Sequence, residues 1–345
     1  MVPALVNRVA KWDNAKAILI FLVVFGHSII TFIDNELMRS VFLWITAFHM
    51  PLFMFLTGLF SKSFVRSEKF RGDKIASYVL LYFFMKLLIH ISLGFVRSWG
   101  TFRWTSEGGT PWYIFVTAVF MTVTFLLKKF NPKKIFVVTV ILALFVGYIK
   151  EIGDEFMLSR IFVYYPYFFL GYMTDRDKLL GFINKWQIKL ASAFVMIAFT
   201  FVIFYFGDDI FSLRYVFTGN NAYAEFGSDW KNYGIFLRAG CYIGSSLVSL
   251  AFLSLIPTKR IPFLSYIGTK TLTIYALHRP VLYILQYTLM NQYMKDLSFE
   301  YDFLILFAGS LIITVLLALK PFDYVLYPCT KCDKWFAPVK KWLKK

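Results

Sequence analysis

Residues 17–33 read AILIFLVVFGHSIITFI, a stretch without a charged side chain. A helix needs about 17–25 mainly apolar residues to cross the hydrocarbon core of a bilayer, and this run meets that length. We do not expect it to be a cleaved signal peptide. No small-residue cleavage site follows it, and Asp34, Asn35 and Glu36 lead directly into the next apolar run. The stretch therefore predicts a first transmembrane helix.

Nine further apolar runs follow the first one along the chain. They lie at 43–61, 75–96, 111–127, 135–149, 160–174, 190–207, 233–256, 271–289 and 302–319. The fifth and sixth of the ten runs are short, and the sixth contains Pro166 and Gly171. The runs are continuous rather than alternating, and in lipid only helices or closed barrels satisfy their backbone hydrogen bonds. The predicted fold class is therefore all-α, a polytopic bundle of about ten transmembrane helices.

Composition supports a membrane protein with one domain. Of the 345 residues, 59% are hydrophobic and only 17% are charged, whereas a soluble domain carries about 25% charged residues. No Gly/Ser-rich or Pro-rich linker divides the chain. We expect a single integral membrane domain over residues 1–345, in which 320–345 form a basic cytoplasmic tail.

The distribution of charge predicts the orientation of the chain. With a cytoplasmic N-terminus, most of the 37 Lys and Arg residues fall on the cytoplasmic side, in the loops at 62–74, 128–134 and 175–189 and in the tail. This asymmetry follows the positive-inside rule and places both termini in the cytoplasm. The net charge of +17 is explained by anionic membrane lipids. No basic domain stands apart from the runs, so a nucleic-acid partner is not expected.

The cysteines carry a weak signal. Cys241 lies in an apolar run and is expected in the core. Cys329 and Cys332 form a C-x-x-C in the tail, without a second Cys pair or a nearby histidine. A structural zinc site needs four ligands, so an ordinary reduced tail is favoured over a metal or redox site.

All four histidines fall within the apolar runs, where ionisable groups are costly and often functional. His27, His49 and His278 are expected at a similar level in the central or outer half of the membrane, whereas His90 lies nearer the outer end of its run. Each of them could simply pack inward against a neighbouring helix. Three at one depth favour a site instead. No Cys or carboxylate accompanies them, so no metal is expected, and histidine suits general-base chemistry near neutral pH.

Basic residues stand at the cytoplasmic ends of two of these runs. Lys16 opens the first run, and Arg71 and Lys74 precede the third. Interfacial snorkelling explains most such residues. The functional alternative is a phosphate-bearing cytoplasmic ligand held beside the membrane.

Prolines interrupt the runs beside two of the three histidines. Pro51 follows His49, and Pro280 follows His278 by two positions. Proline inside a span frees a backbone carbonyl and kinks the helix. The kinks are compatible with a cavity at this depth.

Four segments, in this order, resemble acyltransferase family 3, and the branch they resemble most is the fucose 4-O-acetylase-like group. Arg8 to His27 resembles the family's opening, in which a basic residue, usually Arg, stands eleven positions before the histidine; here it is Lys16. HMPLFMFLTG at 49–58 resembles H-x-P-x-F-x-F-x-S-G, and Pro111 to Tyr113 resembles the start of the fourth span. YIGTKTLTIYALH at 266–278 resembles the late G-x-x-S-L-x-I-Y-x-x-H. Thr replaces Ser in the second and fourth segments.

Two departures concern the basic residues. Lys16 replaces the usual Arg, which keeps the charge but loses planar bidentate recognition of phosphate. The sequence RGDK at 71–74 only half matches the R-x-x-R found before the third span in many members.

The resemblance implies an O-acetyltransferase that uses acetyl-CoA or another acyl-CoA as co-substrate, without a metal. The CoA phosphates would lie near Lys16, Arg71 and Lys74, and the acyl group would pass to a hydroxyl of an extracytoplasmic or lipid-linked glycan. His27 would act as general base or as acyl carrier, with Lys16 as its catalytic partner. The residues expected to shape the site or contact the sugar are His49, Trp112, Tyr113, Thr271, Tyr275 and His278.

The implied setting is a bacterial plasma membrane, with membrane lipids and other cell-envelope biosynthesis proteins as partners.

A transporter or flippase of a small solute or lipid-linked sugar is the main alternative, because many helices with kinks and a polar midplane also describe transporters. Against it, the sequence shows no inverted repeat and no Asp or Glu within the spans for ion coupling. A non-catalytic scaffold in glycopolymer assembly is the second alternative. It would not need Lys16, His27 and the late motif together, so acyl transfer is favoured.

Overall fold

The computed structural model describes residues 9–97, 99–105, 109–226, 231–290 and 299–330. Within these ranges the chain forms helices and no strand, so the predicted all-α class is confirmed. The helices are α1 (Ala10–Ile29), α2 (Glu36–Thr46), α3 (His49–Phe60), α4 (Lys62–Val65), α5 (Gly72–Val96), α6 (Trp112–Leu127), α7 (Pro132–Phe145), α8 (Leu158–Met173), α9 (Arg176–Ile183), α10 (Trp186–Ile210), α11 (Arg214–Thr218), α12 (Gly234–Leu255), α13 (Pro262–Thr269), α14 (Thr271–Leu285), α16 (Phe299–Leu317) and α17 (Lys320–Thr330).

Five helical segments of the described chain are long and apolar enough to cross a membrane. They are Ala10–Phe32, Glu36–Phe60, Gly72–Val96, Trp186–Thr218 and Lys231–Leu255, and α16 with α17, bent by 64°, would make a sixth. Helices α6, α7 and α8 have 14 to 16 residues and are therefore only about 21–24 Å long, shorter than the hydrocarbon core. The count of ten spans and the cytoplasmic location of both termini stay predictions. Residues 1–8 and 331–345 lie outside the described ranges.

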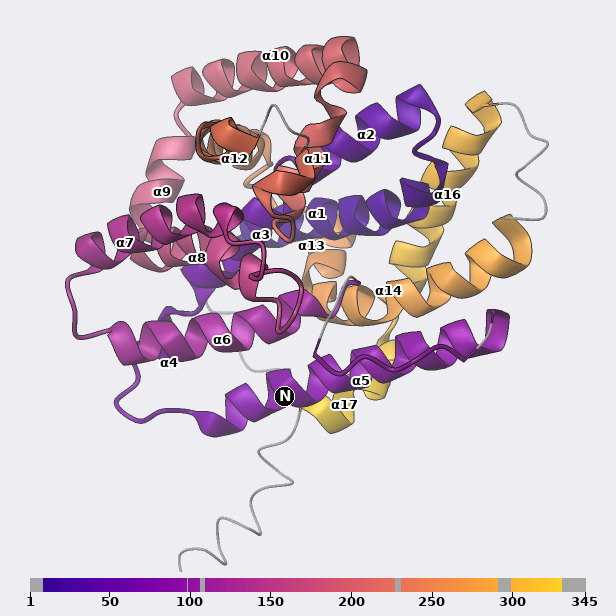
Figure 1. The fold of residues 1–345 in the computed structure, drawn as a ribbon, viewed down its shortest axis with the longest axis horizontal. Helices are drawn as coiled ribbons and strands as arrows, with labels where there is room; N and C mark the ends of the chain where they lie inside the picture. The colour runs from indigo at the N-terminus through magenta and orange to yellow at the C-terminus, as the bar shows by residue number, and fades with distance from the viewer. Residues whose placement is uncertain (1–8, 98, 106–108, 227–230, 291–298, 331–345) are drawn as a thin grey trace, which may run out of the picture.

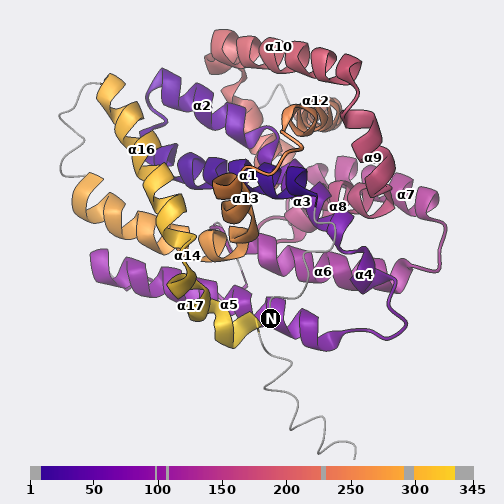
Figure 2. The ribbon, with the colours of Figure 1, turned by 180° about the vertical axis from the view of Figure 1, so that it is seen from behind.

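Helix α1 lies at the centre of the bundle, and α10 and α5 lie at opposite edges (Figures 1 and 2). Helix α1 packs against α2, α3, α13, α14 and α16. In an 18-residue apolar window of its candidate span 61% of the residues are buried, against 17% in such a window of the span that begins with α10. A central helix that carries His27 can therefore be contacted from several directions, whereas α10 mainly offers an apolar surface to lipid.

Helices α3 and α8 cross so closely that only glycine fits at the contact. A Cβ atom on Gly58 would lie 1.8 Å from the carbonyl oxygen of Phe168, and one on Gly171 would lie 1.9 Å from that of Phe55. Close approach through small residues is typical of packing between membrane helices. The crossing fixes the position of α3, whose first residue is His49.

The second apolar run forms one candidate span but consists of two helices, α2 and α3, with a break between them. Pro51 has no N–H to donate to the carbonyl oxygen of Ala47, four residues earlier. The hydroxyl of Ser245 on α12 donates to that oxygen instead. Because this bond replaces the missing one, the backbone stays satisfied and His49 begins a new helix.

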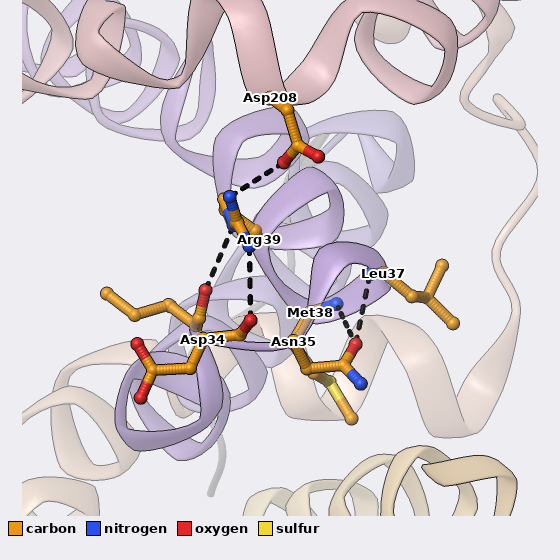
Figure 3. Close-up of polar contacts among 7 residues, drawn as sticks. Asp34, Asn35, Leu37, Met38, Arg39 and Asp208 are labelled. Carbon is orange, nitrogen blue, oxygen red and sulfur yellow. Dashed lines mark hydrogen bonds and ion pairs between the residues drawn. The ribbon is translucent and has the colours of Figure 1, made fainter.

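The connection between α1 and α2 is held by Asn35, Arg39 and Asp208 (Figure 3). The Asn35 side chain accepts hydrogen bonds from the first turn of α2. Arg39 donates to the carbonyl oxygens of Ile33 and Asp34 and lies 2.8 Å from the carboxylate of Asp208 at the end of α10. These contacts fix the end of α1 that carries His27 and tie it to α10.

Candidate active site

His27 and His278 form a hydrogen-bonded pair, with 3.1 Å between Nδ1 of His27 and Nε2 of His278. Nδ1 of His278 lies 3.1 and 2.8 Å from the carbonyl oxygens of Ile274 and Tyr275. A carbonyl oxygen only accepts, so this Nδ1 carries the hydrogen, and Nε2 of the neutral His278 ring accepts from Nδ1–H of His27. Nε2 of His27 is then the nitrogen that keeps its lone pair.

His49 is fixed in the same tautomer by its own helix. Its Nδ1 lies 2.8 Å from the carbonyl oxygen of Ile45 and must donate to it, so Nε2 is left as the acceptor. His27 and His49 line one cavity of about 150 Å³. Two imidazoles that can each accept a proton therefore share one small cavity.

We call this space the histidine cavity; its polar and aromatic wall includes His27, His49, Trp112, Arg160, Tyr164 and Thr218. The Trp112 ring stacks on Tyr164, with 5.0 Å between ring centroids, and the guanidinium of Arg160 lies 5.0 Å from the Trp112 ring. Arg160 also forms an ion pair of 3.1 Å with Asp154. Trp112 is only 9% exposed, so it faces the protein interior and is not an anchor at the membrane interface.

A second cavity, of about 390 Å³, is lined by Lys16 and Lys74, two of the basic residues predicted to bind the donor phosphates. We call it the lysine cavity; its wall also carries hydroxyl groups, from Thr57, Tyr78, Tyr113, Thr117 and Thr271. The hydroxyls of Thr57 and Tyr113 are hydrogen-bonded to each other. Lys16 Nζ lies 2.8 Å from a carboxylate oxygen of Asp13, which holds the lysine in place and offsets part of its charge.

The two cavities follow one another along α1. Lys16 and Ile20 line the lysine cavity, and Val23 and His27 line the histidine cavity. These residues lie on one face of the helix because they are spaced by three or four positions. The eleven residues from Lys16 to His27 correspond to about 16 Å along the axis. A ligand bound at Lys16 would thus have to be long to reach His27.

The structure brings most of the residues predicted for the site into these two cavities. His27, His49 and Trp112 line the histidine cavity, and His278 contacts His27. Tyr275 lines both cavities, and its hydroxyl donates to the carbonyl oxygen of Thr110. Of the other predicted site residues, Lys16, Lys74, Tyr113 and Thr271 line the lysine cavity.

Other residues singled out in the sequence lie elsewhere. The Arg71 side chain is 56% exposed, lies 3.8 Å from the carboxylate of Asp73 and lines neither cavity. The His90 ring packs against Trp99 and Phe102, away from the other histidines. Cys332 lies outside the described ranges. Across those ranges, no group of three or more His, Cys, Asp and Glu side chains is arranged to hold a metal ion.

Three wall residues of the histidine cavity were not expected from the sequence. Arg160 and Tyr164 come from α8, whose apolar run was among the least regular, and Thr218 comes from α11 in the long segment after α10. Arg160 carried a usable signal, because it is a cation at the boundary of an apolar run. Nothing in the sequence around Thr218 indicated that it would line the cavity.

Comparison with known proteins identifies the family of the chain. The family model described as an acyltransferase domain, that of acyltransferase family 3, matches residues 9–319. No curated protein and no solved structure matches the chain. The matched region extends from the start of α1 to just past the end of α16 and contains every residue of both cavities. The chain therefore belongs to acyltransferase family 3 and is a membrane acyltransferase.

Proposed function

We propose that this protein is an O-acetyltransferase that moves an acetyl or other small acyl group from acyl-CoA to a hydroxyl of an extracytoplasmic or lipid-linked glycan. The observation that carries the proposal is the succession of the lysine cavity and the histidine cavity along one face of α1. The lysine cavity offers positive charge to the phosphates of acyl-CoA, and the His27–His278 pair lies further along α1. This order suits a long, anionic donor whose thioester end must reach a base.

The lysine cavity is the proposed donor site. The ammonium groups of Lys16 and Lys74 would attract the CoA phosphates, with Arg71 acting from the exposed surface nearby. The hydroxyl groups of the wall suit the amides of the pantetheine arm: those of Thr57 and Thr117 already donate to backbone carbonyl oxygens and can still accept a hydrogen bond from an amide N–H. Tyr113 belongs to this wall, so its proposed partner is the donor and not the sugar.

His27 is the proposed general base. Its Nε2 would take the proton of the acceptor hydroxyl as the oxygen attacks the thioester carbonyl carbon, so that the C–O bond forms and the C–S bond breaks. The CoA sulfur leaves as a thiolate and receives the proton from His27. The same nitrogen would carry the acyl group if the reaction passed through an N-acyl intermediate. In either case the hydrogen bond to His278 keeps the lone pair on Nε2.

The histidine cavity is the proposed acceptor site. Trp112 lines this cavity and is the proposed aromatic contact of the sugar, and Nε2 of His49 can accept a hydrogen bond from a sugar hydroxyl. The proposed setting is a bacterial plasma membrane, with the lysine cavity toward the cytoplasm and both termini cytoplasmic. Cell-envelope biosynthesis proteins are the proposed suppliers of the glycan, and the fucose 4-O-acetylase-like branch is the proposed position within the family.

The test is an assay of acetyl-CoA turnover by purified protein in lipid nanodiscs, using radiolabelled acetyl-CoA and a panel of envelope glycans. Wild type should consume acetyl-CoA, and His27→Ala should lose about 10²–10⁴-fold in rate, the range expected for a general base. His90→Ala is the matched control, because it removes a histidine from an apolar helix without touching either cavity. Full turnover by His27→Ala would refute the assignment of the base. Label retained on wild-type protein before acceptor is added, and absent from His27→Ala, would favour the acyl carrier.

A further inference from the structure

Arg160 brings a permanent positive charge to the wall of the histidine cavity. It lies in the first turn of α8, its side chain is only 6% exposed, and it lines the cavity together with His27 and His49. Among the described residues that line this cavity there is no Asp or Glu. A guanidinium stays protonated at any physiological pH, whereas a histidine that acts as a base is neutral. The wall of the proposed acceptor site therefore carries a positive charge and no negative one.

Two contacts hold the Arg160 side chain at the cavity. Its guanidinium lies 5.0 Å from the ring of Trp112, which also lines the cavity, and its Nη1 donates to Oδ1 of Asp154 at 3.1 Å. Asp154 lies in the segment before α8 and does not line the cavity, and its side chain is 30% exposed. Because water screens a partly exposed carboxylate, Asp154 offsets only part of the charge that Arg160 brings to the cavity.

A second guanidinium adds to this positive field. Nη1 of Arg279, on α14, donates to the backbone carbonyl oxygen of His27 at 3.3 Å. Among the described residues, no Asp or Glu forms an ion pair with Arg279. Charges of one sign around a cavity with low-dielectric walls raise the local concentration of ligands of the opposite sign. An anionic acceptor is attracted by this field, whereas a neutral sugar gains little from it.

We propose that the acceptor glycan carries an anionic group, a carboxylate or a phosphate, close to the hydroxyl that is acylated, and that Arg160 binds this group. The planar guanidinium has five N–H donors in a fixed arrangement that suits both kinds of anion. The cavity has a volume of only about 150 Å³, so a hydroxyl at His27 and an anion at Arg160 belong to the same sugar or to adjacent ones. This inference rests on the proposed function and narrows its acceptor to acidic glycans.

The experiment offers matched pairs of acceptors, together with acetyl-CoA, to the protein in nanodiscs. An oligosaccharide that contains uronic acid is compared with its carboxyl-reduced form, and a glycan phosphate with its dephosphorylated form. Wild type should use the acidic member of one pair with a kcat/KM about tenfold or more above that of its neutral counterpart, the size expected for a hydrogen bond between charged groups. The pair that shows this preference distinguishes a carboxylate from a phosphate.

Arg160→Gln should lower this acidic-to-neutral ratio of kcat/KM toward one, because it removes the charge and keeps a polar side chain beside Trp112. Asp154→Asn should raise the ratio, since it removes the carboxylate that competes with the acceptor for Arg160. Arg238→Gln is the matched control, because Arg238 is also a buried arginine but lines neither cavity. Its ratio should equal that of wild type. The ratio is the readout because a loss of folded protein lowers turnover of both acceptors equally.

A wild type that uses the neutral member of each pair as well as the acidic one would refute this inference and leave the proposed function intact. A ratio that stays unchanged in Arg160→Gln or in Asp154→Asn would contradict binding of the anion by Arg160 and leave the ion pair with a structural role. Wild type that consumes no acetyl-CoA with any acceptor, acidic or neutral, would remove the proposed function as well.

Discussion

Nδ1 of His27 donates a hydrogen bond of 3.1 Å to Nε2 of His278, although the two residues are 251 positions apart in the sequence. Their rings are stacked, with centroids 5.2 Å apart. His278 is in turn held by backbone carbonyls of its own helix, which cannot change their role as acceptors. The backbone of α14 thus determines which nitrogen of His27 on α1 is free to accept a proton.

This pairing predicts that His278 positions His27 and does not bind substrate. His278→Ala should lower kcat by about 10–100-fold, a part of the 10²–10⁴-fold contribution of a general base, and leave the KM for acyl-CoA unchanged. His278→Gln should recover much of the loss, because its amide oxygen can accept from Nδ1–H of His27. Steady-state kinetics of the two variants measure this difference. A raised KM with unchanged kcat would instead place His278 in the donor site.

The lysine cavity predicts a different kinetic signature for the basic residues. Lys16→Ala should raise the KM for acyl-CoA by about tenfold, since a hydrogen bond to a charged group contributes about 1.5–3 kcal/mol and Asp13 already offsets part of the charge. Arg71→Ala should raise it less, because the Arg71 side chain lines neither cavity. Lys129→Ala is the control, as an exposed lysine of another loop. Equal KM values for Lys16→Ala and Lys129→Ala would exclude phosphate binding by Lys16.

Much of this site could be predicted from the sequence, because the needed information is local. The apolar runs indicate helices, and the position of each histidine within its run gives its depth in the membrane. These depths predict one level for His27, His49 and His278, and the structure places His27 beside His278 and in one cavity wall with His49. The spacing from Lys16 to His27 likewise places a cation and an imidazole on one face of a single helix.

The remaining features depend on which helices become neighbours, and that is not a local property. Pro51 signals a break in the second run, yet the Ser245 hydroxyl that satisfies the freed carbonyl comes from α12. Thr218 reaches the histidine cavity because α11 folds back toward α2 and α12, and no pattern in residues 207–232 indicates this. The direction of the Arg160 side chain follows from the contact of α8 with α3 and α6.

The contact between α3 and α8 predicts which glycines are essential for folding. Gly58→Ala and Gly171→Ala should each destabilise the protein by more than the roughly 1–3 kcal/mol typical of overpacking, because the new Cβ would meet backbone atoms that cannot move aside. Gly240→Ala and Gly244→Ala on α12 are matched controls, since a Cβ there meets no atom within 4 Å. Thermal unfolding of the detergent-purified variants should separate the two pairs. A midpoint for Gly58→Ala equal to that of Gly240→Ala would contradict the close crossing.

His49 predicts a way to separate acceptor binding from the chemical step. Its Nδ1 is committed to the carbonyl oxygen of Ile45, so Nε2 is its only nitrogen for the acceptor, and no hydrogen bond connects it to His27 among the described residues. His49→Ala should therefore raise the KM for the glycan by up to about tenfold, the loss expected for one neutral hydrogen bond. The KM for acyl-CoA should stay the same. We also expect wild type to hydrolyse acetyl-CoA slowly when no glycan is present, and His49→Ala should keep this activity, because water as acceptor needs only His27 as base. If His49→Ala abolished that hydrolysis as completely as His27→Ala, His49 would belong to the proton-transfer step, and the division of labour between the two imidazoles would be wrong.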